Sequence, residues 1–232
     1  MTTTVKRDAH PDPAASQRRS RTKGEHTRIA IKASAQDVMA RDGYAAMRIA
    51  DIMSGAGKSP GAFYLYFKNK EELLHELLQD FRQTLKLEVN RPLGGHEDPL
   101  ANLAERLRVF WCIYRQHWPV ATAAFQMSMQ DASFAQAWHQ VREQGIKGLV
   151  AVIRESRRLQ KRAGHDPDQE QDLELVASAL SSMIEYTCYN WTAKGGDFPG
   201  RDIGDDTAIQ VLTRIVLGAL NPHASAQAYL RR

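Results

Sequence analysis

The 232-residue sequence contains only two cysteines, Cys112 and Cys188, and no apolar run of the roughly 18 residues that span a bilayer. Two cysteines cannot form a disulfide scaffold or a cysteine-rich zinc site, so we expect buried structural thiols. The stretch from Met1 to Lys23 lacks the apolar core of a signal peptide. These absences predict a cytoplasmic protein without a membrane partner.

Motifs for catalysis and metal binding are equally sparse. The sequence has no nucleophile elbow, phosphate loop or dinucleotide-binding glycine pattern. A di-iron helical bundle needs two Glu-x-x-His pairs, and only Glu72 and His75 form one. His139 and Glu143 lack a third ligand at helical spacing. We predict no metal, no cofactor and no enzymatic activity.

Positive charge is concentrated in the N-terminal part of the chain. Residues 1–85 carry 14 Lys and Arg against 10 Asp and Glu, whereas residues 86–232 carry 17 of each. The whole net charge of +4 therefore lies before residue 86. This asymmetry is typical of a phosphate-facing domain joined to a neutral one, although a solvated basic face gives the same count.

Helical periodicity runs through the rest of the chain, without strand alternation or repeats. A first helix is predicted from about Thr27 to Asp42, ended by Gly43. A helix from about Asn69 leads out of the N-terminal part. Further helices are predicted at about 98–117, 119–130, 132–163, 168–194 and 204–220, with prolines at their edges. The predicted fold class is all-α.

Residues 47–67 are the most informative stretch. Apolar positions 49, 52, 53 and 56 give one short helix a buried face, and Gly55 and Gly57 permit a tight turn. Ser59 is expected to cap a second short helix, with Pro60 at its first position. Phe63 and Phe67, four residues apart, would anchor that helix. The layout is typical of a helix-turn-helix.

With Lys68-Asn69-Lys70-Glu71-Glu72-Leu73 following, the stretch from Thr27 to Leu78 resembles the TetR (tetracycline-repressor-like) family of bacterial transcriptional regulators. The resemblance implies an N-terminal three-helix DNA-binding domain and a C-terminal helical ligand-binding and dimerisation domain. We expect a disordered basic arm at 1–22, these two domains at 23–85 and 86–224, and a tail at 225–232.

The second short helix of the motif is expected to read DNA. Its small N-terminal residues can approach base edges closely, and specificity would depend on Tyr66, Lys58, Arg48 and DNA shape. The resemblance implies phosphate contacts by Tyr64, Tyr66, Lys68 and Lys70. Family members often carry Thr and Val where Met47 and Lys58 stand here. The predicted DNA-binding residues are Arg48, Lys58, Ser59, Pro60, Gly61, Ala62, Tyr64, Tyr66, Lys68 and Lys70.

Large apolar and aromatic side chains are frequent in the C-terminal part. They are expected either to fill an ordinary core or to line the effector cavity that the resemblance implies, with Glu185 as a further polar group. Such a cavity suits a small hydrophobic effector. The predicted ligand-binding residues are Phe110, Trp111, Tyr114, Trp118, Phe125, Met129, Trp138, Met183, Tyr186 and Asn190.

The helix predicted at 168–194 is apolar on two sides, so a second subunit is expected to cover one of them. The resemblance implies that the last two long helices pair in a homodimer. The sequence therefore predicts a ligand-responsive repressor released from a palindromic double-stranded DNA operator. The alternatives are a small-molecule-binding helical protein and a nonspecific nucleic-acid binder.

Overall fold

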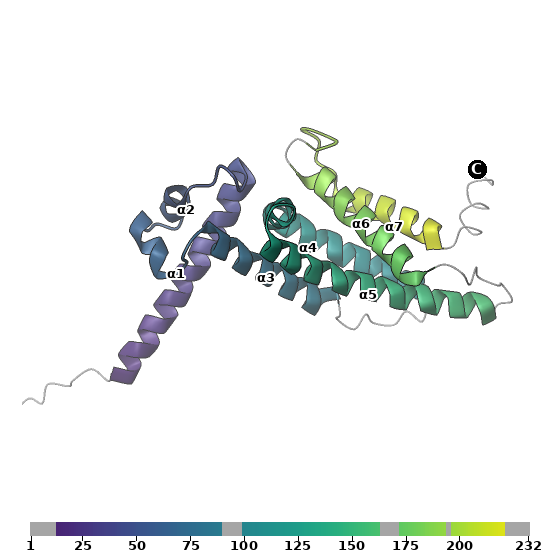
Figure 1. The fold of residues 1–232 in the computed structure, drawn as a ribbon, viewed down its shortest axis with the longest axis horizontal. Helices are drawn as coiled ribbons and strands as arrows, with labels where there is room; N and C mark the ends of the chain where they lie inside the picture. Colours follow the sequence, from purple (N-terminus) through teal and green to yellow (C-terminus); the bar gives the residue numbers. More distant parts are fainter. Residues whose placement is uncertain (1–12, 90–98, 163–171, 194–195, 221–232) are drawn as a thin grey trace, which may run out of the picture. The chain divides into compact units, whose positions relative to one another are not determined.

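The computed structural model describes residues 13–89, 99–162, 172–193 and 196–220 (Figure 1). Every regular element in these ranges is a helix, which confirms the all-α prediction. In chain order they are α1 (Pro13–Asp42), α2 (Ile49–Gly55), the 3₁₀ helix η1 (Pro60–Leu65), α3 (Lys70–Val89), α4 (Pro99–Ser128), α5 (Ala132–Arg162), α6 (Leu173–Thr192) and α7 (Asp205–Leu220).

The chain forms two compact units, residues 1–73 and 74–232. Helix α3 belongs to both, because it begins at Lys70 in the first unit and ends at Val89 in the second. The sequence placed the domain boundary after residue 85, near the end of this helix. The division between the compact units falls one turn after its start, between Leu73 and Leu74.

The core of the first unit follows the predicted periodicity. The apolar face of α1 is buried, and α1 ends at Asp42 before Gly43, whose φ of 80° is left-handed. Its amide donates to the carbonyl of Met39 over 2.9 Å. The buried residues of this face are Ile31, Ala35, Val38 and Met39.

The start of α1 differs from the prediction. The helix extends back to Pro13, so residues 13–22 of the expected disordered arm are helical, while residues 1–12 lie outside the described ranges. Pro13 suits a first helical position, and the alanines, glutamine and arginines that follow are good helix formers. Thr27, near which the helix was predicted to begin, lies inside it, and its hydroxyl donates to the carbonyl of Lys23.

Helices α1 and α2 approach each other closely at Gly55. The Ser34 hydroxyl on α1 donates to the carbonyl of Ile52 over 2.8 Å. A Cβ added at Gly55 would lie 2.2 Å from that hydroxyl oxygen. Gly55 therefore serves helix packing, and the positive φ that the turn requires is supplied by Gly57.

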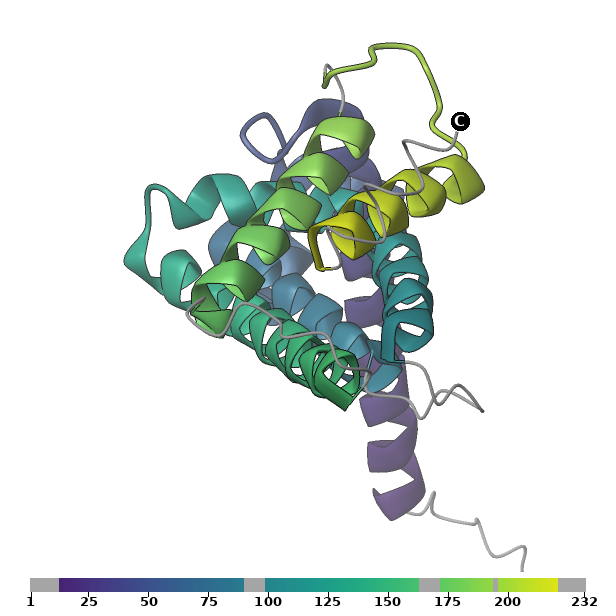
Figure 2. The same cartoon turned by 90° about the vertical axis from the view of Figure 1, so that its right-hand side faces the viewer.

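In the second unit, α4 packs against α5, α6 and α7, and Figures 1 and 2 show α6 and α7 over the same side of the α4–α5 pair. The predicted break between two helices near Pro119 is present as a kink within α4. The backbone at His117 is non-helical (φ −111°, ψ 15°), so two helical segments meet there. Proline removes one helical hydrogen bond, and burial on both sides of the kink, at Tyr114 and Val120, keeps the halves together.

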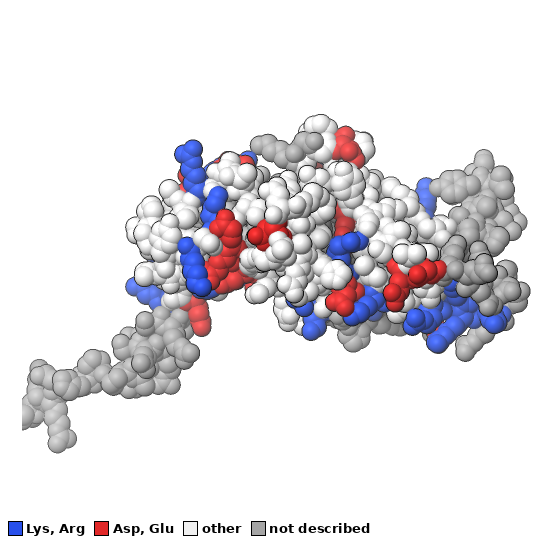
Figure 3. All heavy atoms as spheres, viewed as in Figure 1, with Lys and Arg blue, Asp and Glu red and all other residues white. Residues whose placement is uncertain are grey.

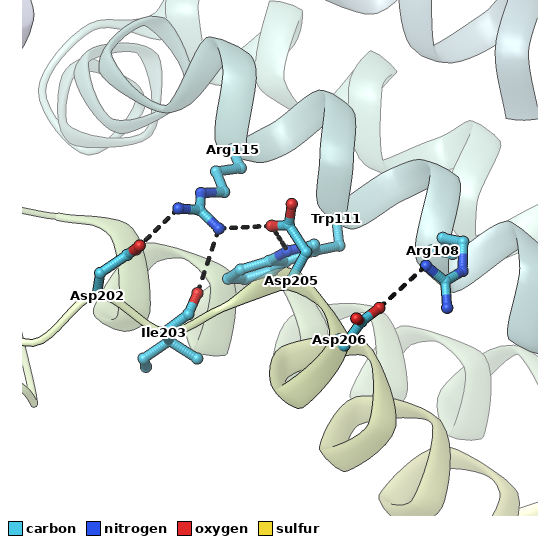
Figure 4. Close-up of polar contacts among 7 residues, drawn as sticks. All are labelled: Arg108, Trp111, Arg115, Asp202, Ile203, Asp205 and Asp206. Carbon is cyan, nitrogen blue, oxygen red and sulfur yellow. Dashed lines mark hydrogen bonds and ion pairs between the residues drawn. The ribbon is translucent and has the colours of Figure 1, made fainter.

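A polar clamp joins α4 to the start of α7 (Figure 4). The Asp205 carboxylate accepts from Trp111 Nε1 over 2.8 Å and from the Arg115 guanidinium over 2.6 Å. The same guanidinium reaches Asp202 at 2.8 Å and the carbonyl of Ile203. The clamp fixes the segment before α7, and its donors lower the pKa of Asp205, the Trp111 hydrogen bond most.

Candidate nucleic-acid interface and ligand cavity

The helix-turn-helix of the first unit is built from α2, the four-residue turn 56–59 and η1. Gly57 adopts φ 65°, which only glycine does without strain. The amide of Lys58 then donates to the carbonyl of Met53 over 2.8 Å, which ties the turn to α2. The predicted glycine turn is confirmed at Gly57.

The second short helix differs in detail from the prediction. It is a six-residue 3₁₀ helix with Pro60 at its start. Ser59 occupies the cap position in extended backbone conformation (ψ 147°), but its hydroxyl makes no capping bond. The amide of Ala62 bonds the Ser59 carbonyl instead. The Ser59 side chain thus stays exposed to solvent.

Two phenylalanines and one arginine hold η1 in place. Phe63 and Phe67 are 0% and 2% exposed, with ring centroids 5.6 Å apart. The Arg28 guanidinium of α1 stacks over Phe67 at 4.5 Å and donates to the Tyr66 carbonyl over 2.9 Å. Because these contacts fix the inner face of η1, its other side chains point outward.

The outer face carries the predicted DNA-binding residues. Tyr64 is 64% exposed, and Leu65, which the sequence analysis did not select, is 80% exposed. Figure 3 shows basic and acidic side chains side by side on the first unit, so its visible face is no continuous basic field. Exposed members of the predicted set are Arg48, Lys58, Ser59, Pro60, Gly61, Tyr64 and Lys68, whereas Ala62, Tyr66 and Lys70 are half-buried.

The start of α3 satisfies its own polar groups. The Asn69 side chain accepts from the Glu72 amide over 2.8 Å, and the Glu72 carboxylate accepts from the Lys68 amide in return. This reciprocal capping box occupies donors that an anion would otherwise use. The Lys70 ammonium donates to the carbonyl of Met47 over 2.9 Å, which anchors the segment before α2.

A cavity of about 340 Å³ lies in the second unit between α3, α4, α5 and α6. Its size is at the low end of the roughly 300–1,000 Å³ typical of ligand sites. Most of its lining is aliphatic or aromatic, and Gly148 leaves space along α5, whereas Gly145 lies opposite the Ser181 hydroxyl. The wall includes Phe81 and Leu85 of α3, Leu103, Leu107, Phe110 and Tyr114 of α4, and Trp138 and Leu149 of α5.

One half-buried ion pair forms part of the cavity wall. The Arg142 guanidinium of α5 donates to Glu185 Oε2 over 2.8 Å, and the Ser181 hydroxyl donates to Oε1 over 2.6 Å. Arg142 also donates to the Ser182 hydroxyl. Burial raises the pKa of Glu185, while Ser181 and Arg142 act in the opposite direction. The pair joins α5 to α6.

The predicted ligand-binding residues are distributed over several environments. Phe110, Tyr114 and Trp138 line the cavity, as does Glu185. A separate, more polar hollow beside the α4–α7 clamp is lined by Trp111, Trp118 and Asn190. Of the others, Phe125 packs on Trp138 and Tyr189, Met183 is half-buried, and Met129 and Tyr186 are 70% and 58% exposed.

Sequence reasoning missed several cavity residues, namely Phe81, Leu85, Arg106 and the α5 face that contains Gly145 and Gly148. The α5 positions at 138, 141, 142, 145, 148, 149 and 152 follow helical spacing, and two glycines on one apolar face are a signal of open space. Phe81 and Leu85 of α3 carried no such signal, because every helix that packs into a core has apolar residues at this spacing.

Apolar side chains remain exposed on α6 and α7. Leu175 and Tyr186 of α6 are 69% and 58% exposed, and Val211 and Ile215 of α7 are 39% and 47% exposed. The opposite stripe of α6, with Ala177, is buried inside the unit. Helix α6 therefore has apolar side chains on two sides, as predicted.

The described residues contain neither a candidate membrane span nor a candidate metal site. No helix among them is long and apolar enough to cross a membrane. No group of three or more metal-ligating side chains was found in the same ranges.

The sequence profile of bacterial regulatory proteins of the tetR family matches residues 31–77. The HTH-type transcriptional regulator EthR of Mycolicibacterium smegmatis is 25% identical over 204 residues, which are 88% of this chain and 90% of that protein. The fatty acid degradation regulator FadR from Bacillus halodurans superposes with a TM-score of 0.62 at 20% identity, over 82% of this chain and 94% of that one. A transcriptional regulator from Rhodococcus sp. Rha1 gives 0.65 at 17% identity, over 84% and 96%.

Proposed function

The chain belongs to the tetR family of bacterial regulatory proteins and is a transcriptional regulator, and we propose that it is a repressor which a small hydrophobic effector releases from a palindromic operator. One observation carries the proposal. Helix α3 begins beside the helix-turn-helix, where Lys70 bonds the Met47 carbonyl, and its later residues Phe81 and Leu85 line the cavity. One helix thus contributes residues to both sites.

For the DNA-reading half, we propose that the exposed face of η1 enters the major groove. Tyr64 and Lys68 would contact phosphates, and the small residues at 60–62 would lie against base edges. Lys58 and Arg48, exposed on either side of α2, would extend the backbone contacts. Leu65 joins this set, because an apolar side chain 80% exposed on the same short helix suits a thymine methyl group.

For assembly, we propose a two-fold homodimer through the exposed apolar faces of α6 and α7. These faces need cover, and a second copy supplies the same faces by symmetry. Two η1 helices could then occupy successive major grooves, about 34 Å apart. Exchange of Ile215 for Arg, which places a charge in that contact, should convert the dimer to monomer in sedimentation.

For the effector, the apolar wall of the cavity supports a hydrophobic molecule. The relative FadR is named as a regulator of fatty acid degradation, which is consistent with such a ligand. Effector binding would favour one of two positions of α3 and so weaken operator binding by differential affinity for the two states.

The test is selection of random DNA duplexes by the full-length protein, followed by gel-shift titration of the enriched sequence. We expect an enriched palindrome. Tyr64→Ala and Lys68→Ala should each weaken binding by about 5- to 30-fold, since each removes a phosphate contact of about 1–2 kcal/mol. Lys161→Ala, an exposed cation on α5, is the matched control and should have no effect.

Two outcomes would contradict the proposal. Equal affinity for the selected and a scrambled duplex, lost steeply as salt rises, would indicate a nonspecific nucleic-acid binder. An absence of DNA binding, with ligand binding by the cavity intact, would indicate a small-molecule-binding protein whose first unit is only structural.

A further inference from the structure

We propose that the cavity takes an amphipathic anion: an aliphatic or aryl chain with a single acidic group, for which Arg106 is the counter-charge. The inference rests on the proposed function, because it names the chemical class of the effector. It follows from the balance of charges around an otherwise apolar space.

The charged groups of the lining are three cations and one carboxylate. The cations are Lys86, Arg106 and Arg142, and the carboxylate is Glu185. Both oxygens of Glu185 are already engaged, one by Arg142 and the other by the Ser181 hydroxyl. Glu185 and Arg142 therefore neutralise each other, and Lys86 has an interaction of its own, so the positive charge that remains for a ligand is that of Arg106.

Arg106 carries that charge on the cavity side of α4. It lines the cavity with Leu103, Leu107 and Phe110, at helical spacings of three, one and four residues. Among the residues that the structure describes, none forms a hydrogen bond or ion pair with the Arg106 side chain. The adjacent acid, Glu105, pairs instead with Arg108 at 3.9 Å, and Arg108 also reaches Asp206 of α7.

A half-buried guanidinium with no ion-pair partner among the described residues is costly to leave beside an apolar wall. Guanidinium groups bind carboxylates and related oxyanions through paired N–H donors, and such charge-assisted bonds are stronger than neutral ones. A neutral ligand of the same length would fill the cavity but leave Arg106 uncompensated. A cationic ligand would meet a like charge, which disfavours it.

The cavity also has room for the apolar chain of such a ligand. Gly148 lines it, and a Cβ added there would meet nothing within 4 Å. Aromatic rings of Phe110 and Trp138 form part of the same wall. An anion held by Arg106 would therefore extend its chain along the glycine-containing face of α5.

The experiment compares decanoate, decan-1-ol and decylamine, which share one chain and differ in head-group charge at pH 7. Binding to the full-length protein is followed by tryptophan fluorescence, because Trp138 lines the cavity. We expect decanoate to bind about 10- to 100-fold more tightly than the alcohol, from one charge-assisted hydrogen bond. The amine should bind most weakly.

Variants assign the preference to one residue. Arg106→Met, of similar length and apolar, should bring decanoate to the affinity of the alcohol, and Arg106→Lys should keep part of the preference. Arg154→Met is the matched control, since Arg154 is exposed on α5 and outside the lining. Gly148→Leu should weaken all three ligands by filling the space. Melting temperatures of each variant report whether it folds.

Equal affinity of wild type for acid and alcohol, an unchanged preference in Arg106→Met, or binding of none of the three probes would overturn the inference. Its failure is distinguishable from failure of the proposed function, which is judged by operator binding. If decan-1-ol binds as tightly as decanoate and releases the operator, the repressor proposal stands and the anion proposal is wrong.

Discussion

The two units of the chain use glycine and aromatic side chains in opposite ways. In the first unit, Gly55 lets α1 and α2 touch, and Phe63 is completely buried. In the second, Gly148 opens onto a cavity, and Phe110 is half-buried along its wall. The first unit has a close-packed interior that fixes an outer face, whereas the second keeps internal space next to charged groups. Close packing favours one shape, and internal space favours response to a ligand.

The largest expected difference concerns the aromatic residues. Phe63→Ala should lower the free energy of unfolding by about 3–5 kcal/mol, the usual cost of emptying a filled core position. Phe110→Ala should cost roughly 1–2 kcal/mol, because part of its surface already lacks packing partners. Urea unfolding by circular dichroism measures both. Equal losses would show that the two interiors are packed alike.

A smaller difference between the units is expected for Gly→Ala substitutions, whose effects on stability should have opposite signs. Gly55→Ala forces a methyl group against the Ser34 hydroxyl and should destabilise by about 1–3 kcal/mol. Gly148→Ala meets nothing within 4 Å and should stabilise α5 by about 0.5–1 kcal/mol through its higher helix propensity. Thermal unfolding gives both values.

The double variant Ser34→Ala, Gly55→Ala serves as the control for this pair. It should recover part of the loss, since the hydroxyl oxygen that the new methyl group meets is gone. A destabilising Gly148→Ala, or a neutral Gly55→Ala, would contradict the contrast between the units.

The smallest expected effect is a response to acid confined to the second unit. Hydrogen bonds from Trp111 and Arg115 lower the pKa of Asp205, so its contribution to stability is present above about pH 4 and is lost as pH falls through its folded-state pKa. Because the carboxylate is largely exposed, the effect should be modest. All four tryptophans lie in the second unit, so their fluorescence reports it.

Asp205→Asn should remove this acid-induced change while keeping a hydrogen-bond acceptor for Trp111. A titration of the variant identical to that of wild type below pH 4 would assign the change to other carboxylates. The expected result is a flat fluorescence signal in the variant where wild type changes.

The sequence predicted the first unit better than the second, for a local reason. The Gly57 turn, the Pro60 start and the buried pair Phe63 and Phe67 are encoded within about ten residues. Propensity and periodicity suffice there, because the signals and the structure share the same short range. The long helix α1 was underestimated since its first turns lack an apolar period.

The cavity could not be predicted in the same way. It depends on which faces of four helices meet, and this is set by crossing angles that periodicity does not encode. Phe110 and Trp138 were identified from their size alone, and the same criterion selected Met129 and Tyr186, which are exposed. Side-chain size could not identify Arg106 as a cavity residue, because a cation in a helix is ordinarily solvated.

Helix α4 has different partners on its two sides: Phe110 and Arg106 face the cavity, while Trp111 and Arg115 grip the segment that starts α7 (Figure 4). The ligand is thus separated from the start of α7, which carries part of the proposed subunit contact, by the thickness of one helix, about 10 Å. No relay of side chains through the interior is needed over such a span. A ligand that displaces α4 sideways would therefore also displace α7, because Trp111 and Arg115 hold the two helices together.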